Sequence, residues 1–266
     1  MSIRGFQRAL ADLVSSPDLC RETLDTPASL GTRYDLTELE QRRLLYCAGH
    51  RGMKVCWGLH RANRLGPIHA NFRLTCVALG SHLRDELEAF WRDSLPRDLQ
   101  FQSESDRFAA FLFRRVRDRE LNLPIIEDVM RFELAISSLR FQSRRQVSGT
   151  LAQAAVETNF VMTLHPFLRL IQFSHEPERL LEALTQKQPV PSDLARGEFF
   201  VLADAKKEGA PAIRIVDNRL GNILNSFQLG FPPPLSAAEM NSLLDAGLIA
   251  RWPQEAPMAR SAMQLV

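Results

Sequence analysis

The sequence predicts an α+β protein: an N-terminal all-α helical domain followed by a small winged-helix-like α/β domain. Three observations lead to this fold class. Apolar residues recur at helical spacing along the first half, and no strand pattern occurs before residue 140. Alternating residues rich in Phe, Val and Ile begin at residue 159. The C-terminal segments then follow in the order strand, turn, strand, helix, helix, strand.

Apolar stripes predict the N-terminal helices, because side chains three or four positions apart share one helix face. The stripes are Ile3, Phe6, Leu10 and Leu13; Leu79, Leu83, Leu87 and Phe90; Phe108, Phe111 and Leu112; and Val129, Phe132, Ile136 and Leu139. Capping signals predict where helices begin and end. The starts are Ser16–Pro17, Thr37 with Glu40, Ser103 with Asp106, and Pro124, and one end is Ser94 to Pro96.

Strand patterns dominate the part of the chain after residue 159. The predicted order is two short strands or one bent strand over Asn159 to Phe173, a helix over Glu176 to Leu184, a strand over Glu198 to Ala203, a turn over Lys206 to Ala210, and a strand over Ala212 to Val216. His165-Pro166 is the break in the first of these. In the last strand, alternation places Ile213 and Ile215 on one face and Arg214 on the other.

Two amphipathic helices and a closing strand complete the predicted order. Leu220, Ile223, Leu224 and Phe227 form the apolar face of the first helix, and Ser236 with Glu239 is a capping box for the second. The closing strand covers Leu248 to Trp252. We therefore expect a helical domain over residues 1–145, a second domain over 150–255 and a loose tail over 256–266.

Composition narrows the classes of protein to consider. The chain is 45% hydrophobic and 24% charged with a formal net charge of +2, which is typical of a globular protein and too balanced to indicate nucleic acid. The N-terminus reads as an amphipathic helix rather than a signal peptide, and no apolar stretch is long enough to span a bilayer. We expect a cytoplasmic protein without membrane contact, whose four cysteines are thiols.

Four residues form the best candidate for a metal site. Cys47, His50, Cys56 and His60 are thiol and imidazole groups, which are the ligands that zinc prefers. Their spacing differs from that of standard zinc fingers, and Gly49 and Gly52 lie between the pairs. Ordinary helix residues are the favoured interpretation, and a zinc-binding protein is kept as an alternative. Cys76 lies in an apolar stretch and is expected to be a core thiol.

No catalytic motif is present in the sequence. Paired carboxylates occur at Asp85, Glu86 and Glu88 and at Glu127, Asp128 and Glu133, where they alternate with arginines. We expect solvated ion pairs on helix surfaces rather than a general acid–base site. There is no nucleophile elbow, Walker loop, dinucleotide fingerprint or HExxH. The sequence therefore predicts no catalytic residue and no cofactor in this chain.

DNA recognition is a further alternative, because a winged-helix-like domain can place a helix in the major groove. The helix that follows Ser236 offers Glu239, Asn241, Ser242 and Asp245, and none of these is Lys or Arg. Phosphate would repel the two acidic residues. A basic run at Arg114, Arg115, Arg117 and Arg119 lacks interleaved aromatic residues, so it favours a solvated face or an acidic partner. Both features argue against nucleic acid.

Peptide capture by strand addition fits the second domain better. A small sheet with an exposed edge accepts an extended peptide through main-chain hydrogen bonds. We expect the edge strand and an apolar groove beside the following helix to form the site, with arginines that meet an acidic peptide. The predicted site residues are Ala212, Ile213, Arg214, Ile215, Val216, Arg219, Met240, Leu243 and Leu244.

Two groups of segments resemble a known family. The first is ANFRLTCVALGSHLRDELEAFWRD, RFAAFLFRR and LPIIEDVMRFELAISSL, and the second is TLHPFLRLIQF, GEFFVLAD, AIRIVDNRLGNILNSF and LSAAEMNSLLDAGLIARW. The first resembles the helical domain of partner subunits of multinuclear non-haem iron enzymes, of the type found in methanobactin and 3-thiaglutamate biosynthesis. The second is similar to their PqqD-like peptide recognition element. The resemblance covers residues 60 to 255.

The resemblance implies a non-catalytic subunit of a heterodimer. Its partner would be a TIM-barrel enzyme with two or three iron ions, docked on the helical domain. This chain would bind the leader of a ribosomally made precursor peptide and present its cysteine for oxidative modification. Chain length favours the 3-thiaglutamate type, in which the β-carbon of a C-terminal cysteine is removed, over the methanobactin type.

Overall fold

The computed structural model describes residues 3–93, 101–142, 144–156 and 159–253, and divides into two compact units. Unit 1 comprises Met1–Ala70 and Ser81–Leu112, and unit 2 comprises Asn71–Gly80 and Phe113–Val266. Unit 1 is helical, whereas unit 2 combines helices with two small sheets, so the α+β class is confirmed. No helix within the described ranges combines the length and apolar character that crossing a bilayer requires.

Unit 1 is built from α-helices and one short 3₁₀ turn. They are α1 (Ile3–Ser15), α2 (Pro17–Asp25), α3 (Ser29–Arg33), α4 (Glu38–Gly49), α5 (Met53–Asn71), η1 (Gly80–His82), α7 (Leu83–Asp93) and α8 (Phe101–Arg117). The predicted caps of α2 and α4 are confirmed. Ser16 Oγ accepts from Leu19 N–H, and Thr37 and Glu40 form the complete capping box.

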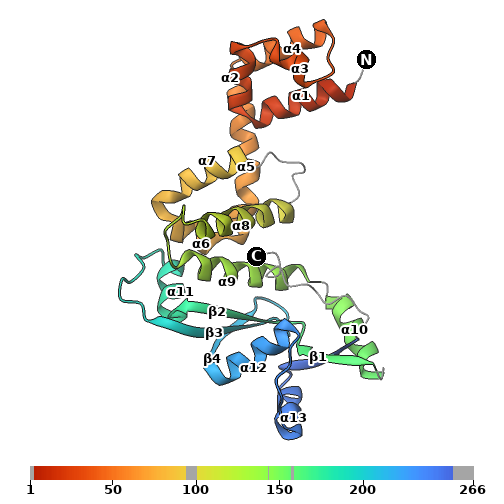
Figure 1. The fold of residues 1–266 in the computed structure, drawn as a ribbon, viewed down its shortest axis with the longest axis vertical. Helices are drawn as coiled ribbons and strands as arrows, with labels where there is room; N and C mark the ends of the chain where they lie inside the picture. The colour runs from red at the N-terminus through yellow and green to blue at the C-terminus, as the bar shows by residue number, and fades with distance from the viewer. Residues whose placement is uncertain (1–2, 94–100, 143, 157–158, 254–266) are drawn as a thin grey trace. The chain divides into compact units, whose positions relative to one another are not determined.

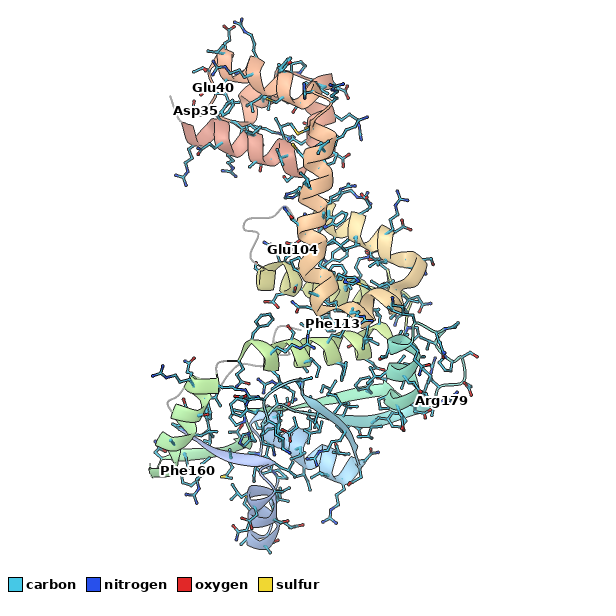
Figure 2. The ribbon with its side chains drawn as sticks, turned by 180° about the vertical axis from the view of Figure 1, so that it is seen from behind. Asp35, Glu40, Glu104, Phe113, Phe160 and Arg179 are labelled. Carbon is cyan, nitrogen blue, oxygen red and sulfur yellow. The ribbon has the colours of Figure 1, made fainter. Side chains whose placement is uncertain are left out.

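The core of unit 1 is packed around apolar residues of its first five helices: Ala9, Leu13, Cys20, Leu30, Leu44, Ala48 and Met53. Farther along, a buried ion pair joins α5 to α8. Arg64 Nε donates to Glu104 Oε1 at 2.5 Å, and Arg107 Nη2 donates to Glu104 Oε2 at 2.7 Å. Glu104 is labelled in Figure 2. The Phe90 and Phe108 rings meet edge to face with centroids 5.3 Å apart.

Unit 2 contains the remaining helices and all strands of the described residues. They are α6 (Arg73–Leu79), α9 (Ile126–Phe141), α10 (Arg144–Val156), β1 (Phe160–Leu164), β2 (Leu168–His175), α11 (Pro177–Thr185), β3 (Arg196–Asp204), β4 (Ala212–Val216), α12 (Asn218–Leu229), α13 (Ala237–Asp245) and β5 (Ile249–Pro253). The predicted order from β3 to β5 is therefore confirmed. The prediction from sequence did not include α10.

The strands form two antiparallel sheets. One sheet has the order β2-β3-β4, and the other pairs β1 with β5. Helix α9 covers one face of the three-stranded sheet and α12 covers the other, as Figure 1 shows. Val201 and Ala203 of β3 face α9, whereas Phe200 and Leu202 face α12. Apolar residues on both faces of β3 thus give this sheet two cores.

Arginine side chains hold the turns beside the sheets. Arg169 is buried and donates from Nη1 to the carbonyls of Pro166 (2.9 Å) and Leu168 (2.7 Å). Burial lowers the pKa of Arg169. Arg144 of α10 donates to the carbonyls of Ala205 and Lys206, just beyond β3. The His165-Pro166 break is therefore a fixed turn that separates β1 and β2 into different sheets.

Some predicted boundaries differ from the structure. The stripe from Leu79 to Phe90 is not one helix, because Gly80 has a φ of +50° and a 3₁₀ turn follows it. Ser103 lies inside α8 rather than at its cap, since that helix begins at Phe101. The predicted helix end at 94–96 and the tail at 256–266 lie outside the described residues.

The division between the units also differs from the expected boundary near residue 145. Helix α9 packs on the three-stranded sheet through Val129, Ala135 and Leu139. Leu74, Val77 and Ala78 of α6 join the same cluster, so residues 71–80 belong with the sheet although they lie between two parts of unit 1. A boundary based on helical composition misses this arrangement, because α6 and α9 are helices that serve the sheet.

Candidate functional site

The outer edge of β2 is closed by side chains. Leu170 N–H donates to Gln228 Oε1 at 2.9 Å, and Gln228 Nε2 donates to Leu170 C=O at 3.0 Å. Farther along the strand, Ser174 N–H donates to Asp128 Oδ1 at 3.0 Å. These side chains satisfy main-chain groups of β2 that another strand would otherwise satisfy, so this edge is protected against strand addition.

The opposite edge, β4, is open, and the pairing register shows which amides point outward. Leu170 directs its main-chain groups to Gln228, so its pair with Leu202 is not hydrogen-bonded. Leu202 must then bond across to Arg214 of β4. Because N–H and C=O direction alternates along a strand, Ile213 and Ile215 point their main-chain groups away from β3. No other described residue bonds to those groups.

The β4 side chains add an exposed apolar face to this edge. Ile213 and Ile215 are 42% and 50% exposed, and they lie on the sheet face shared with Ala203 and Val201. Arg214 lies on the other face and is exposed, without a carboxylate partner among the described residues. Val216 is buried and anchors the strand in the core beneath α12. The sequence predicted this alternation correctly.

The other predicted site residues lie on helices α12 and α13 of unit 2. Met240, Leu243 and Leu244 of α13 are half-buried and belong to the same core cluster as Val216. Helix α13 itself packs on β5. Arg219 at the start of α12 forms an exposed ion pair with Glu239 at 3.2 Å. The structure thus brings Ala212 to Val216 together as one edge, while the charge of Arg219 already has a partner.

The four candidate zinc ligands do not converge. Cys47 lies in α4, His50 is its C-cap, and Cys56 and His60 lie in α5. His50 Nδ1 accepts from Gly52 N–H at 3.1 Å, and burial lowers the pKa of His60. Within the described ranges, no three His, Cys, Asp or Glu side chains come close enough to hold a metal ion. The zinc alternative has no support in this geometry.

The residues considered for DNA binding are exposed on α13, and two arginines of the basic run form ion pairs. Glu239, Asn241, Ser242 and Asp245 of α13 are exposed, so the helix presents an acidic and neutral surface. In the basic run, Arg115 pairs with Glu120, and Arg117 pairs with Asp118 at 3.2 Å. DNA phosphates would therefore repel the acidic side chains of α13.

The expectation of solvated carboxylates is wrong for three residues. Glu86, Asp128 and Glu133 are buried. Asp128 Oδ2 lies 2.8 Å from His175 Nδ1, and Glu133 accepts from the N–H groups of Leu74 and Thr75 at 2.7 and 2.8 Å. Glu133 therefore satisfies the free amides that begin α6. Two other carboxylates, Glu127 and Glu88, form half-exposed ion pairs with Arg131 and Arg61.

Sequence reasoning missed Gln228 and Asp128, the residues that close the β2 edge. A signal for Gln228 was present: it directly follows Phe227 and lies four residues after Leu224, beside the apolar face of α12. A polar side chain next to a buried stripe needs a hydrogen-bond partner. Asp128 gave no comparable signal, because its partner Ser174 lies 46 residues away.

No protein-family model matches the chain, and no curated protein matches its sequence.

Proposed function

We propose that this chain is a non-catalytic subunit that binds the leader of a ribosomally made precursor peptide by strand addition at β4. The observation that carries the proposal is the difference between the two edges of the three-stranded sheet. Gln228 and Asp128 occupy the β2 edge, whereas the outward main-chain groups of Ile213 and Ile215 have no partner in the part of the chain that the structure describes. Unprotected edges favour association with another strand, and an extended peptide satisfies such an edge.

The order β3-β4-α12-α13-β5 supports a finer proposal about the fold. We propose that it is a winged-helix-like, PqqD-like recognition element, with β4 as its peptide-binding strand. The half-buried Met240, Leu243 and Leu244 would offer apolar contacts to peptide residues beyond the edge itself. A bound peptide would gain affinity from main-chain hydrogen bonds and specificity from side chains.

The iron-containing partner enters this proposal through the segment resemblance. We propose that a TIM-barrel enzyme with two or three iron ions forms a heterodimer with this chain and modifies a cysteine of the bound precursor. A 3-thiaglutamate-type reaction, which removes the β-carbon of a C-terminal cysteine, is favoured over a methanobactin-type reaction. Iron would then be ligated by the partner, and this chain would contribute binding and positioning.

Exposed apolar side chains on unit 1 support a docking role for the helical region. Leu39 and Tyr46 of α4 and Val55 and Leu59 of α5 are exposed. Large apolar residues on a surface are a common feature of protein interfaces. Co-expression of the full chain with the barrel enzyme tests this step. Tyr46→Arg and Leu59→Arg should reduce co-purification, whereas Lys54→Arg, which keeps the charge on α5, should not.

The peptide site is tested by measuring leader binding to the full chain with a fluorescently labelled peptide. Ile215→Pro removes an outward N–H donor without removing a ladder bond to β3, because edge positions with outward amides tolerate proline. We expect at least about a tenfold loss of affinity, since one main-chain hydrogen bond and its geometry are lost. Ile215→Val keeps the amide and should bind nearly as the parent does. Equal affinities for the two variants would place the site elsewhere.

A further inference from the structure

The β4 edge that is open to a peptide is equally open to the same edge of a second copy of this chain. Closed two-fold dimers are the commonest assemblies, and an unprotected edge strand is a template for one. Strand β4 has two outward-facing residues, Ile213 and Ile215. An antiparallel pairing about a two-fold axis uses all four outward positions only when Ile213 of each copy faces Ile215 of the other.

That register places Arg214 directly opposite Arg214 of the second copy. The pair lies between two hydrogen-bonded pairs, so it is a non-hydrogen-bonded pair with Cα atoms about 4.5 Å apart and side chains close together. Like charges directly opposite each other destabilise a sheet. Repulsion between the two Arg214 side chains therefore opposes the one register that would use the whole edge.

The neighbouring two-fold registers use the edge poorly. Centring on Ile213 brings Pro211 opposite Ile215, and proline has no N–H to donate. Centring on Ile215 brings Asp217 opposite Ile213. The Asp217 carbonyl already accepts from Gly221 N–H at 2.8 Å, and its side chain caps α12 by accepting from Leu220 N–H. The flanks of β4 thus leave the Arg214-centred register as the productive one.

The charge of Arg214 also determines which kind of peptide segment suits the β4 edge. Arg219 is neutralised by Glu239, but Arg214 has no carboxylate partner among the described residues. A segment paired in the same register would place one side chain opposite Arg214, and its two neighbours beside Ile213 and Ile215. We propose that Arg214 rejects a second copy of this chain and selects an extended segment with an acidic residue between two apolar residues. The selection half rests on the proposed function, and the rejection half does not.

The rejection half is tested by sedimentation of the full chain over a range of concentrations. Arg214→Thr replaces the charge by a residue that pairs well with itself across strands, and we expect self-association about tenfold tighter than in the parent. Arg214→Glu restores like-charge repulsion and should stay monomeric. Adding Ile215→Pro to Arg214→Thr should abolish the new dimer. A monomeric Arg214→Thr, or a dimer that survives Ile215→Pro, overturns the inference.

The selection half is tested with two extended peptides that differ only at the central position, apolar–Glu–apolar and apolar–Lys–apolar. The parent should prefer the Glu peptide about fivefold or more, and Arg214→Glu should reverse the preference. Equal binding of both peptides by the parent overturns selection by Arg214. If neither peptide nor the leader binds while Arg214→Thr dimerises, the proposed function fails and the rejection of a second copy is supported.

Discussion

Gln228 lies beside Leu170 so that its side-chain amide makes the two hydrogen bonds that a neighbouring strand would make, at 2.9 and 3.0 Å. The glutamine belongs to α12 and the leucine to β2, 58 positions apart. One side chain therefore imitates a peptide group and ends the sheet on that side. This relationship separates the closed edge from the open edge and leads to the first prediction.

Gln228→Leu should open the β2 edge. The substitution keeps an apolar stem but removes both hydrogen bonds, leaving the N–H and C=O of Leu170 without their partner. We expect a loss of about 1–3 kcal/mol in the free energy of unfolding and new concentration-dependent association. Urea unfolding and light scattering measure the two effects. Gln186→Leu is the control, because the Gln186 side chain donates to Glu182 Oε1 on the exposed end of α11 and bonds to no strand. Identical behaviour of the two variants would contradict the role given to Gln228.

Gly221→Ala should destabilise unit 2, although alanine usually favours helices over glycine. A Cβ at position 221 would lie 2.2 Å from the Phe200 ring, because α12 approaches β3 closely there. The ring is fully buried, so we expect a loss of about 1–3 kcal/mol from overpacking. The matched control is Gly149→Ala in α10, where nothing lies within 4 Å of the new Cβ. A stabilised Gly221→Ala would show that the helix stands farther from the strand.

Glu133 should make stability depend on pH. Burial raises its pKa to about 7 from an ordinary value of 4.5, although the Leu74 and Thr75 amides act in the opposite direction. The folded chain therefore holds this proton at pH values where the unfolded chain has released it. The resulting stabilisation is fully present below about pH 4.5 and is lost as the pH rises through about 7.

The Glu133→Gln variant cannot titrate at this position. The stability of the parent relative to the variant should fall as the pH rises from about 4.5 to 7, by on the order of 1–3 kcal/mol. Urea unfolding of both proteins across this range measures the difference. Parallel stability curves would mean that the carboxyl group titrates alike in the folded and unfolded chains.

Three of the four cysteines should separate into two reactivity groups. Cys20 and Cys76 are buried, and burial raises their pKa values to about 11 and about 12, whereas Cys56 is exposed. Because only the thiolate reacts, brief alkylation near pH 8 should label Cys56 and should reach Cys20 and Cys76 only after unfolding. Mass spectrometry of the labelled peptides measures this. Protection of Cys56 together with Cys47, relieved by a chelator, would instead favour the zinc alternative.

Local signals explain which parts of the fold were predictable. The capping boxes at Thr37 and at Ser236 depend on residues three positions apart, and both formed as expected. The break at Gly80 was not predictable from periodicity, because the 3₁₀ turn keeps Leu79 and Leu83 in a continuous apolar pattern. The end of α6 and the whole of α7 therefore have the apolar pattern of a single helix.

Long-range contacts explain what the sequence could not predict about the site. The strand Ala212–Val216 and its alternation follow from five consecutive residues. Whether its edge is the open one depends on Gln228 reaching Leu170, and on Asp128 reaching Ser174. The burial of Glu133 likewise depends on amides 58 and 59 positions away. No short window of sequence contains both partners of these bonds.

The assignment of residues 71–80 to unit 2 has a consequence for genetic dissection of the protein. The chain passes from unit 1 to unit 2, returns to unit 1 and passes to unit 2 again, with junctions near residues 70, 80 and 112. A truncation after residue 112 would keep α6 but discard α9, leaving Leu74 and Val77 without the cluster they join. The two units therefore cannot be exchanged between homologues as cassettes at a single splice point, and a transplanted sheet must bring α6 with it.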